Sequence, residues 1–422
     1  MKEEFLYYLW TYQLITSDLK TTANQKIRVI SPGSQNTDSG PDFFNAMIEI
    51  GDTKWAGNVE IHVLSSDWYK HNHENNPSYD NIILHVVLTD DKPVHRMNKE
   101  LIPTLELRNR FSMSILENYT GFLNSRNNIP CSNLIHNIKH FDSLSWFDAL
   151  MAERLEKKSL EILDVLKLTK NNFLQVFYQR LARSFGYTAN ADAMELLASI
   201  TPISLISKHN DSIVQIESLL FGQSGLLTNK LKDSYPRKLL KEYKYLKNKY
   251  NLYSMDNTNW KFMRMRPVSF PTIRISQFAN IIYNSSGILN IILETDKLAD
   301  IISLLSTSAS PYWKDHYRFD KITPGKSKKL GLSSINIILI NTIIPIMFVY
   351  GKVKNNTSLH DRALTWLSQI KPESNKITRE FSSMGLKAEN AMQSQAMIQL
   401  KNDYCSKKRC LGCRFGHILL NR

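Results

Sequence analysis

Residues 40–87 read GPDFFNAMIEIGDTKWAGNVEIHVLSSDWYKHNHENNPSYDNIILHVV, and this stretch decides the fold of the first part of the chain. Apolar side chains alternate before a Gly51-Asp52 turn, and alternation resumes over residues 55–63. Alternation on both sides of a Gly-Asp turn predicts a β-hairpin. We expect its first strand to place four side chains on the apolar face: Phe44, Ala46, Ile48 and Ile50.

Polar side chains lie on the opposite face of the second hairpin strand. Because side chains alternate along a strand, Glu60 and His62 share one face, roughly 6.5 Å apart. Asp42 opens the preceding strand. We therefore expect Asp42, Glu60 and His62 to converge on one site. The alternative is that Asp42 caps a turn while the other two lie on a solvated strand face.

The flanking segments extend the hairpin into a small α/β domain. A helical spacing of apolar residues over 2–14 predicts a first helix, and β-type runs predict strands at 26–30, 81–88 and 104–107. The order of helix, strand, hairpin and further strands fits an α/β layer. We assign this domain to residues 1–123.

The rest of the chain is dominated by helical periods. The segment from Ser145, SWFDALMAERLEKKSLEILDVL, has apolar residues three and four apart behind a serine that can cap a helix. We predict a linker at 124–144 that carries Cys131, a mainly helical domain at 145–400, and a cysteine-bearing segment at 401–422. The most apolar run, 335–350, is interrupted by polar residues and predicts a buried helix.

The charge of the chain indicates a polyanionic partner. Its 422 residues carry 53 Lys and Arg against 39 Asp and Glu, a net charge of +14. A basic balance of this size favours nucleic acid. Four cysteines in a chain of this length exclude a disulfide scaffold, and the acidic, aromatic start MKEEFLYYLW is not a secretion signal. We expect a cytoplasmic protein without a membrane partner.

Motifs along nearly the whole chain resemble an uncharacterised bacterial family, a domain of unknown function. They are GPDF at 40–43, W-x-G-N-V-E-I-H at 55–62, LFGQSGLL at 220–227, RMRPVSFPTIRISQFA at 264–279, and the cysteine-bearing end. This resemblance implies no activity.

Pro41-Asp42 followed by Glu60-Ile61-His62 also resembles the motif of PD-(D/E)XK nucleases. There a carboxylate opens the second strand and E-x-K follows on the third. The resemblance implies that Asp42 and Glu60 hold Mg²⁺ or Mn²⁺ for phosphodiester hydrolysis. His62 stands in place of the lysine, where it can act as a base or as a third ligand.

Three further histidines accompany this motif. His71 and His73 form an H-x-H pair in the following loop, and His85 lies within the strand at 81–88. They are possible additional ligands of a zinc or manganese ion shared with Glu60 or His62. The alternative is that the loop histidines are surface residues and His85 is a core residue.

The cysteines give the sharpest local signal. Cys405, Cys410 and Cys413 have the spacing C-x4-C-x2-C, and Cys131 is the remaining cysteine. This spacing is typical of an iron–sulfur cluster and lies within the range that zinc accepts. We predict one site built from all four. The alternative is reduced thiols without a metal.

Two basic segments are candidate nucleic-acid contacts. The first lies beside aromatic residues and prolines near residue 267, and the second lies between the clustered cysteines. The candidates are Arg264, Arg266, Arg274, Lys407, Lys408 and Arg409. The alternative for the arginines is structural pairing with acidic residues.

Together these observations predict a PD-(D/E)XK-like α/β domain followed by a mainly α-helical domain, acting as a metal-dependent nuclease. One alternative is a catalytically silent protein that binds nucleic acid or serves as a scaffold. Another is a zinc hydrolase of a small substrate, in which the histidines carry the metal.

Overall fold

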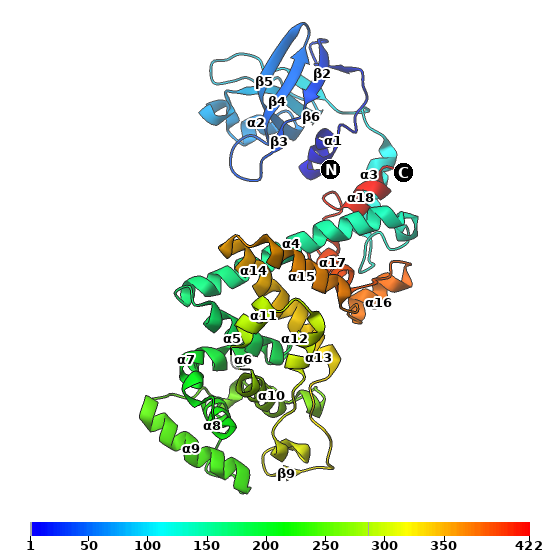
Figure 1. Cartoon of the computed structure of the whole chain (residues 1–422). Coiled ribbons are helices and arrows are strands. Elements are labelled where there is room, and N and C mark those ends of the chain that lie inside the picture. The colour runs from blue at the N-terminus through cyan, green and yellow to red at the C-terminus, as the bar shows by residue number, and fades with distance from the viewer. Residues whose placement is uncertain (1, 286) are drawn as a thin grey trace. The chain divides into compact units, whose positions relative to one another are not determined.

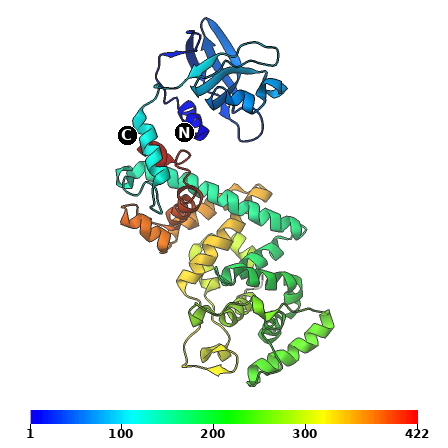
Figure 2. The ribbon, with the colours of Figure 1, turned by 180° about the vertical axis from the view of Figure 1, so that it is seen from behind.

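The chain divides into two structural units. The computed structural model describes residues 2–285 and 287–422 (Figures 1 and 2). Unit 1 comprises the chain up to Trp146 together with residues 384–386 and 400–422, and unit 2 comprises 147–383 and 387–399. The last segment of the chain therefore belongs to the same unit as the first.

Unit 1 is built on a mixed sheet of seven strands. The strand order is β1-β2-β4-β5-β6-β7, and β3 pairs with β4. The pairs from β1 to β5 are antiparallel, whereas β5, β6 and β7 are parallel to one another. The strands are β1 (Leu19–Lys20), β2 (Lys26–Ser31), β3 (Ser34–Gln35), β4 (Phe43–Ile50), β5 (Thr53–Leu64), β6 (Ile82–Thr89) and β7 (Thr104–Glu106). The predicted hairpin is β4–β5, with Ile50 paired to Thr53 across the turn.

A β-bulge interrupts β4 close to its start. Phe43 pairs with Val59 but Ala46 pairs with Gly57, so β4 holds one residue more than β5 over this interval. Asn45 adopts the left-handed conformation there, with φ of 57°. The extra residue changes which side chains face the core. Phe43 is 1% exposed. Phe44 is only half-buried, so its predicted place on the apolar face is wrong.

The bulge also decides the direction of Asp42. Partners across a sheet point to the same face and neighbours along a strand point to opposite faces. Because Phe43 pairs with Val59, Asp42 lies on the face of Glu60. Without the extra residue, Asp42 would share the face of Ile61 instead.

Short helices cover the sheet and close unit 1. They are α1 (Glu3–Thr11), α2 (Asp67–Lys70), α3 (Met113–Asn124), α18 (Arg414–Leu420), the 3₁₀ turns η1 (His73–Asn75), η2 (Pro77–Tyr79) and η3 (Ile135–Asn137), and the π-helical segment η9 (Leu400–Cys405). Helix α1 packs on β5, and α18 contacts α3 and η3. Contacts of α18 with these elements dock the C-terminal segment within unit 1.

Unit 2 is mainly helical, as predicted. It begins within α4 (His140–Leu168), which starts five residues before Ser145. Ser145 thus lies inside the helix, and the predicted cap at this residue is wrong. The other helices are α5 (Phe173–Phe185), α6 (Ala191–Ile200), α7 (Ile203–Ile206), α8 (Ile213–Gln223), α9 (Ser234–Tyr250), α10 (Pro271–Asn284), α11 (Ile288–Glu294), α12 (Leu298–Leu305), α13 (Leu332–Ile338), α14 (Ile344–Lys354), α15 (Thr357–Gln369), α16 (Lys376–Ser383) and α17 (Ala391–Gln399).

Smaller elements connect these helices. They are the 3₁₀ turns η4 (Ser207–His209), η5 (Asn257–Asn259), η6 (Pro267–Ser269) and η7 (Pro311–Lys314), the two-stranded sheet of β8 (His316–Arg318) and β9 (Lys321–Ile322), and the π-helical segment η8 (Leu339–Ile343).

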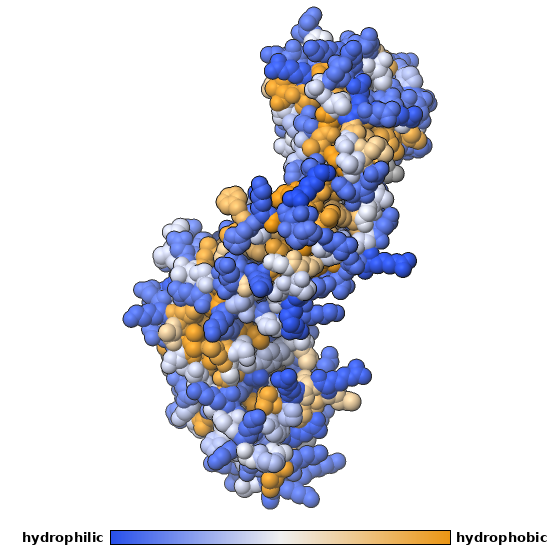
Figure 3. Space-filling view, turned by 90° about the vertical axis from the view of Figure 1, so that its right-hand side faces the viewer, coloured by the Kyte–Doolittle hydropathy of each residue, from blue (hydrophilic) through white to orange (hydrophobic). Residues whose placement is uncertain are grey.

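The most apolar segment of the chain is a core helix of unit 2. Elements α13, η8 and α14 run continuously from Leu332 to Lys354, a segment long and apolar enough to cross a membrane. However, 61% of its most apolar window is buried in the structure, as in the core helix of a soluble protein. The predicted buried helix at 335–350 is confirmed. On the face shown in Figure 3, hydrophobic areas lie among hydrophilic residues in both units.

Candidate metal centre and cysteine cluster

Asp42 and Glu60 meet at the junction of β4 and β5. The backbone N–H of Asp42 donates to Glu60 Oε2 at 3.1 Å, and the N–H of Ile61 donates to Asp42 Oδ2 at 2.9 Å. The hydroxyl of Tyr7, from α1, donates to Asp42 Oδ1 at 2.9 Å. Glu60 is only 4% exposed and His62 only 2%. The alternative of a solvated strand face is therefore wrong.

Three histidines complete this cluster. The ligand atoms of His62, His71 and His73 all lie within 4.8 Å of one another. His62 Nε2 is 3.1 Å from His71 Nδ1, and Glu60 Oε1 is 3.2 Å from His73 Nε2 and 3.7 Å from His62 Nε2. Two nitrogens on one zinc ion, each bound at about 2.0–2.1 Å, lie about 3.0–3.4 Å apart. The cluster thus has the spacing of a coordination sphere, and the exposed His71 opens it to solvent.

His85 lies behind His62, outside the group of possible ligands. Its Nε2 is 2.8 Å from His62 Nδ1, and the residue is fully buried. A ring that binds a metal through Nε2 carries its proton on Nδ1. His62 can therefore donate to His85 while its Nε2 faces the centre of the cluster. His85 is placed to orient His62 and not to bind a metal itself.

Aromatic residues that the sequence analysis missed enclose the cluster. The Tyr79 ring stacks on His73 with centroids 3.8 Å apart, and Trp68 contacts the rings of both His73 and His85. Tyr7 reaches Asp42 from 35 residues away. The sequence indicates a role for Tyr7 only through its position, because this tyrosine lies outside the apolar stripe of the first predicted helix.

Burial strongly shifts the protonation of the cluster. Desolvation, followed by the nearby charge of Glu60, raises the pKa of Asp42 to about 7. Burial raises the pKa of Glu60 to about 8 and lowers the pKa of His62 to about 2. The imidazole of His62 is therefore uncharged at neutral pH, as a metal ligand must be. A bound cation would compensate the cost of ionising both carboxyl groups.

Unit 1 also contains a groove of about 650 Å³. Tyr7 lines the groove, and its hydroxyl links the groove to Asp42. Four exposed basic residues line it, against one acidic residue, Glu4: Lys2, Lys407, Lys408 and Arg409. Of these, Lys407 pairs with Asp403 at 2.6 Å. One of the two predicted basic segments thus lines a groove that shares Tyr7 with the candidate site.

The other basic segment lies in unit 2, and its three arginines differ. Arg264 and Arg266 are exposed. Arg274 is only 6% exposed, donates to Gln277 Oε1 at 2.8 Å and lies over the Tyr187 ring. Because α10 begins at Pro271, its helical turn directs Arg274 into the core. The prediction that Arg274 contacts nucleic acid is wrong.

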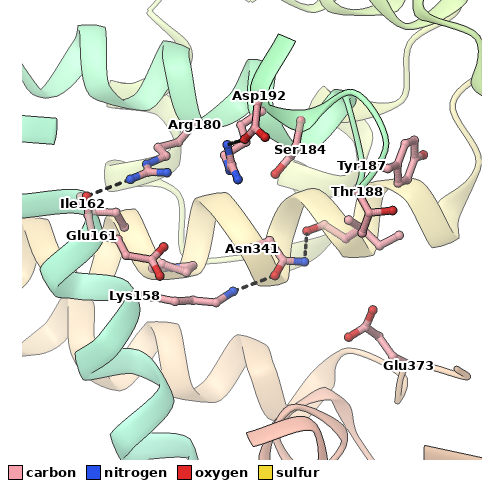
Figure 4. Close-up of a pocket in the computed structure, with 14 residues that line it drawn as sticks. Lys158, Glu161, Ile162, Arg180, Ser184, Tyr187, Thr188, Asp192, Asn341 and Glu373 are labelled. Carbon is pink, nitrogen blue, oxygen red and sulfur yellow. Dashed lines mark hydrogen bonds and ion pairs between the residues drawn. The ribbon is translucent and has the colours of Figure 1, made fainter. Parts of the chain in front are cut away.

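Unit 2 has a pocket of its own, about 590 Å³ in volume, shown in Figure 4. Three basic and three acidic side chains line it: Lys158, Arg180, Arg183, Glu161, Asp192 and Glu373. Arg183 pairs with Asp192 at 2.6 Å, and Lys158 donates to Asn341 Oδ1 at 2.7 Å. These charges balance and are partly paired within the protein, so the pocket does not favour a ligand of either charge.

The four cysteines gather around a second centre in unit 1. Cys131, Cys405, Cys410 and Cys413 are all buried and line one cavity of about 20 Å³. Burial raises the pKa of Cys131 and of Cys410 to about 12 each. Without a cation the thiols therefore stay protonated. Cys131, from the predicted linker, lies with the three cysteines that follow it by more than 270 positions.

A comparison with family models identifies the chain. The model described as "Protein of unknown function (DUF2851)" matches residues 3–376. Searches of curated proteins and of solved structures find no match. The family match agrees with the resemblance expected from the sequence motifs. Because the matched region spans nearly the whole chain, the protein belongs to the DUF2851 family.

Proposed function

We propose that unit 1 is a metal-dependent hydrolase that cleaves phosphodiester bonds in nucleic acid. One observation carries this proposal: the buried carboxylate of Glu60, the half-buried carboxylate of Asp42 and three histidines converge at a single site. Such a set of charged and ligating groups is costly to bury without a cation. A divalent metal bound there would polarise a phosphoryl oxygen and lower the pKa of a bound water.

The donor set favours Mn²⁺ or Zn²⁺ over Mg²⁺. Imidazole nitrogens suit transition metals, whereas Mg²⁺ prefers oxygen ligands and water. We assign Glu60, His62, His71 and His73 as the ligands. Asp42 lies next to Glu60, where it can accept a hydrogen bond from the attacking water or complete the coordination sphere. The other role considered for His62, that of a free base, is less compatible with its Nε2 facing His71 at 3.1 Å.

The position of the acidic residues supports the PD-(D/E)XK interpretation. Asp42 immediately precedes β4, and Glu60 and His62 lie on β5, the next strand of the sheet. This is where that motif places its two acidic positions. The histidine that replaces lysine is consistent with a change of preferred metal.

The groove supports nucleic acid as the substrate. Its basic side chains can neutralise phosphates, and Tyr12, which is 49% exposed, offers a ring on which a base can stack. Tyr7 connects this surface to Asp42. A strand bound in the groove would contact Tyr7, which donates to Asp42.

Cleavage assays with labelled oligonucleotides test the proposal. Mn²⁺ should support cleavage by the full-length protein, and Asp42→Asn or Glu60→Gln should each lower the rate by about 100-fold or more. Glu49→Gln is the matched control, because Glu49 lies on the same hairpin and pairs with Arg28 away from the cluster. Full activity in both site variants would refute the assignment.

A small-substrate zinc hydrolase is the second candidate, favoured by the three histidines. Comparing oligonucleotides with a small chromogenic phosphodiester separates the two functions. Cleavage of the small ester alone would favour this candidate. Oligonucleotide binding without cleavage under any divalent metal would favour the catalytically silent binding protein.

A further inference from the structure

We propose that Cys131, Cys405, Cys410 and Cys413 hold an iron–sulfur cluster and not a single zinc ion. This site is separate from the histidine cluster, and the proposal does not depend on the hydrolase activity. It rests on three features of the cysteine site: the spacing of the sulfur atoms, the cavity between them and the residues that surround them.

The spacing of the sulfurs favours a centre larger than a single zinc ion. A single zinc ion binds each thiolate at about 2.3 Å, which places all four sulfurs about 3.8 Å from one another. Among the described residues, no three cysteine sulfurs lie within 4.8 Å of one another, although the histidine triad meets this limit. In a four-iron cluster each thiolate binds its own iron, so the sulfurs stand farther apart than they do around one zinc ion. In a two-iron cluster only pairs of sulfurs are close.

The cavity shows that the four cysteine side chains face one common space. The four cysteines line a cavity of about 20 Å³, which is room for about one water molecule. A tetrahedron of sulfurs closed around zinc leaves no space for even a water molecule, because its centre lies about 2.3 Å from every sulfur. An iron–sulfur cluster brings its own sulfide ions, so its thiolates surround a larger centre than a single zinc ion does.

The surroundings suit a cluster that is shielded from water. Phe122, Pro130 and Tyr404 line the same cavity, together with the charged Arg409. An apolar shell limits solvent access and tunes the potential of a cluster. The charge of Lys408 acts on Cys410, and that of Lys401 acts on Cys405. These cations offset part of the negative charge that four thiolates bring.

The loop between the clustered cysteines links this site to the groove. Lys407, Lys408 and Arg409 lie between Cys405 and Cys410 and line the groove. Lys408 donates to the backbone oxygens of Leu123 and of Ser125. The cluster would therefore fix one wall of the groove in addition to fastening the end of the chain.

Metal analysis of the full-length protein tests the proposal. Protein purified without oxygen should be brown, absorb near 400 nm, and contain two or four iron atoms with matching acid-labile sulfide per chain. Mössbauer spectroscopy distinguishes the two-iron from the four-iron form. Colourless protein with one zinc per chain would overturn the proposal, and so would protein that contains neither metal after iron and sulfide reconstitution.

A pair of neighbouring variants tests the contribution of Cys131. Cys131→Ser should lose the visible absorbance and most of the iron, whereas Ser132→Ala should keep both. If Cys131→Ser retains full iron and an unchanged spectrum, the four-cysteine assignment is wrong. Should that variant fail to fold, the composition of the unsubstituted protein still decides between iron and zinc.

Discussion

His85 illustrates how a residue outside the proposed coordination sphere can control it. The Nε2 of His85 lies 2.8 Å from the Nδ1 of His62, and His85 is itself fully buried. Removing such an outer partner usually costs 10–100-fold in metal affinity. We expect His85→Ala to weaken Mn²⁺ or Zn²⁺ binding by about this factor, as measured by isothermal titration calorimetry. His136→Ala, an exposed histidine of the same unit, should leave the affinity unchanged. Equal metal affinities for the two variants would show that His85 does not support the metal site.

At the residue scale, local patterns predict only part of the site. Asp42, Glu60 and His62 stand out because a hairpin brings residues close in sequence to one place. Tyr7 contributes from another helix, and its contact with Asp42 depends on how α1 packs on β5. The wrong prediction that Arg274 contacts nucleic acid has the same origin. Whether an arginine is buried in a helical core depends on tertiary packing, and a local pattern of arginines and prolines does not contain this information.

Among the secondary-structure elements, β4 contains the feature on which the site depends most. Asn45 has a φ of 57°, a conformation that asparagine tolerates and β-branched residues avoid. We expect Asn45→Val to destabilise the protein by about 1–2 kcal/mol and to weaken metal binding, because relief of the strain removes the bulge. Asn45→Gly should be close to neutral. Urea unfolding and metal titration measure the two effects.

Met47→Val provides the matched control for this prediction. Met47 is exposed on the same strand, in extended conformation, so a β-branched side chain there should be tolerated. If Asn45→Val binds metal as tightly as Met47→Val does, the bulge is not what aligns Asp42.

The sequence could not indicate this bulge, because Phe43 and Phe44 are both apolar and either one completes an alternating pattern.

Helix α4 carries a lysine that should make stability depend on pH. Burial, with the neighbouring charge of Arg154 as the next cause, lowers the pKa of Lys158 to about 7 from 10.5. Between these values the unfolded chain binds more protons than the folded protein, so stability rises with pH. The contribution of uncharged Lys158 to the stability of the folded protein is lost as pH falls through 7. Lys158→Met should flatten this slope in urea unfolding between pH 7 and 10, whereas Lys167→Met on the same helix should retain it.

On the scale of the whole molecule, the net charge of +14 makes salt dependence informative. Each phosphate neutralised by a basic side chain adds about 0.7–0.9 to the slope of log affinity against log salt. We expect Lys407→Glu with Lys408→Glu to lower this slope for oligonucleotide binding, measured by fluorescence anisotropy. Lys167→Glu on unit 2 should not change it. A slope that falls only when Arg264 and Arg266 are replaced would place the contact surface in unit 2.

The broad division of the chain could be predicted from the sequence, whereas the assignment of its last segment could not. Alternation of period two ends near residue 107 and helical spacing dominates after residue 145, which predicts an α/β part followed by a helical part. Residues 400–422 continue the helical character of the segments before them, yet they belong to unit 1. Only the cysteines hinted at this return, because a shared metal site requires Cys131 and the final cysteines to meet.

The return of the last segment to unit 1 affects how the protein is made. A ribosome releases residues 1–146 early and adds 400–422 only after all of unit 2, at a rate of about 5–20 residues per second. During that interval the emerging first unit lacks α18 and three of the four thiols. The N-terminal unit must therefore wait until residues 400–422 have been made to complete its fold, and a nascent chain that stalls within unit 2 cannot form the cysteine site at all.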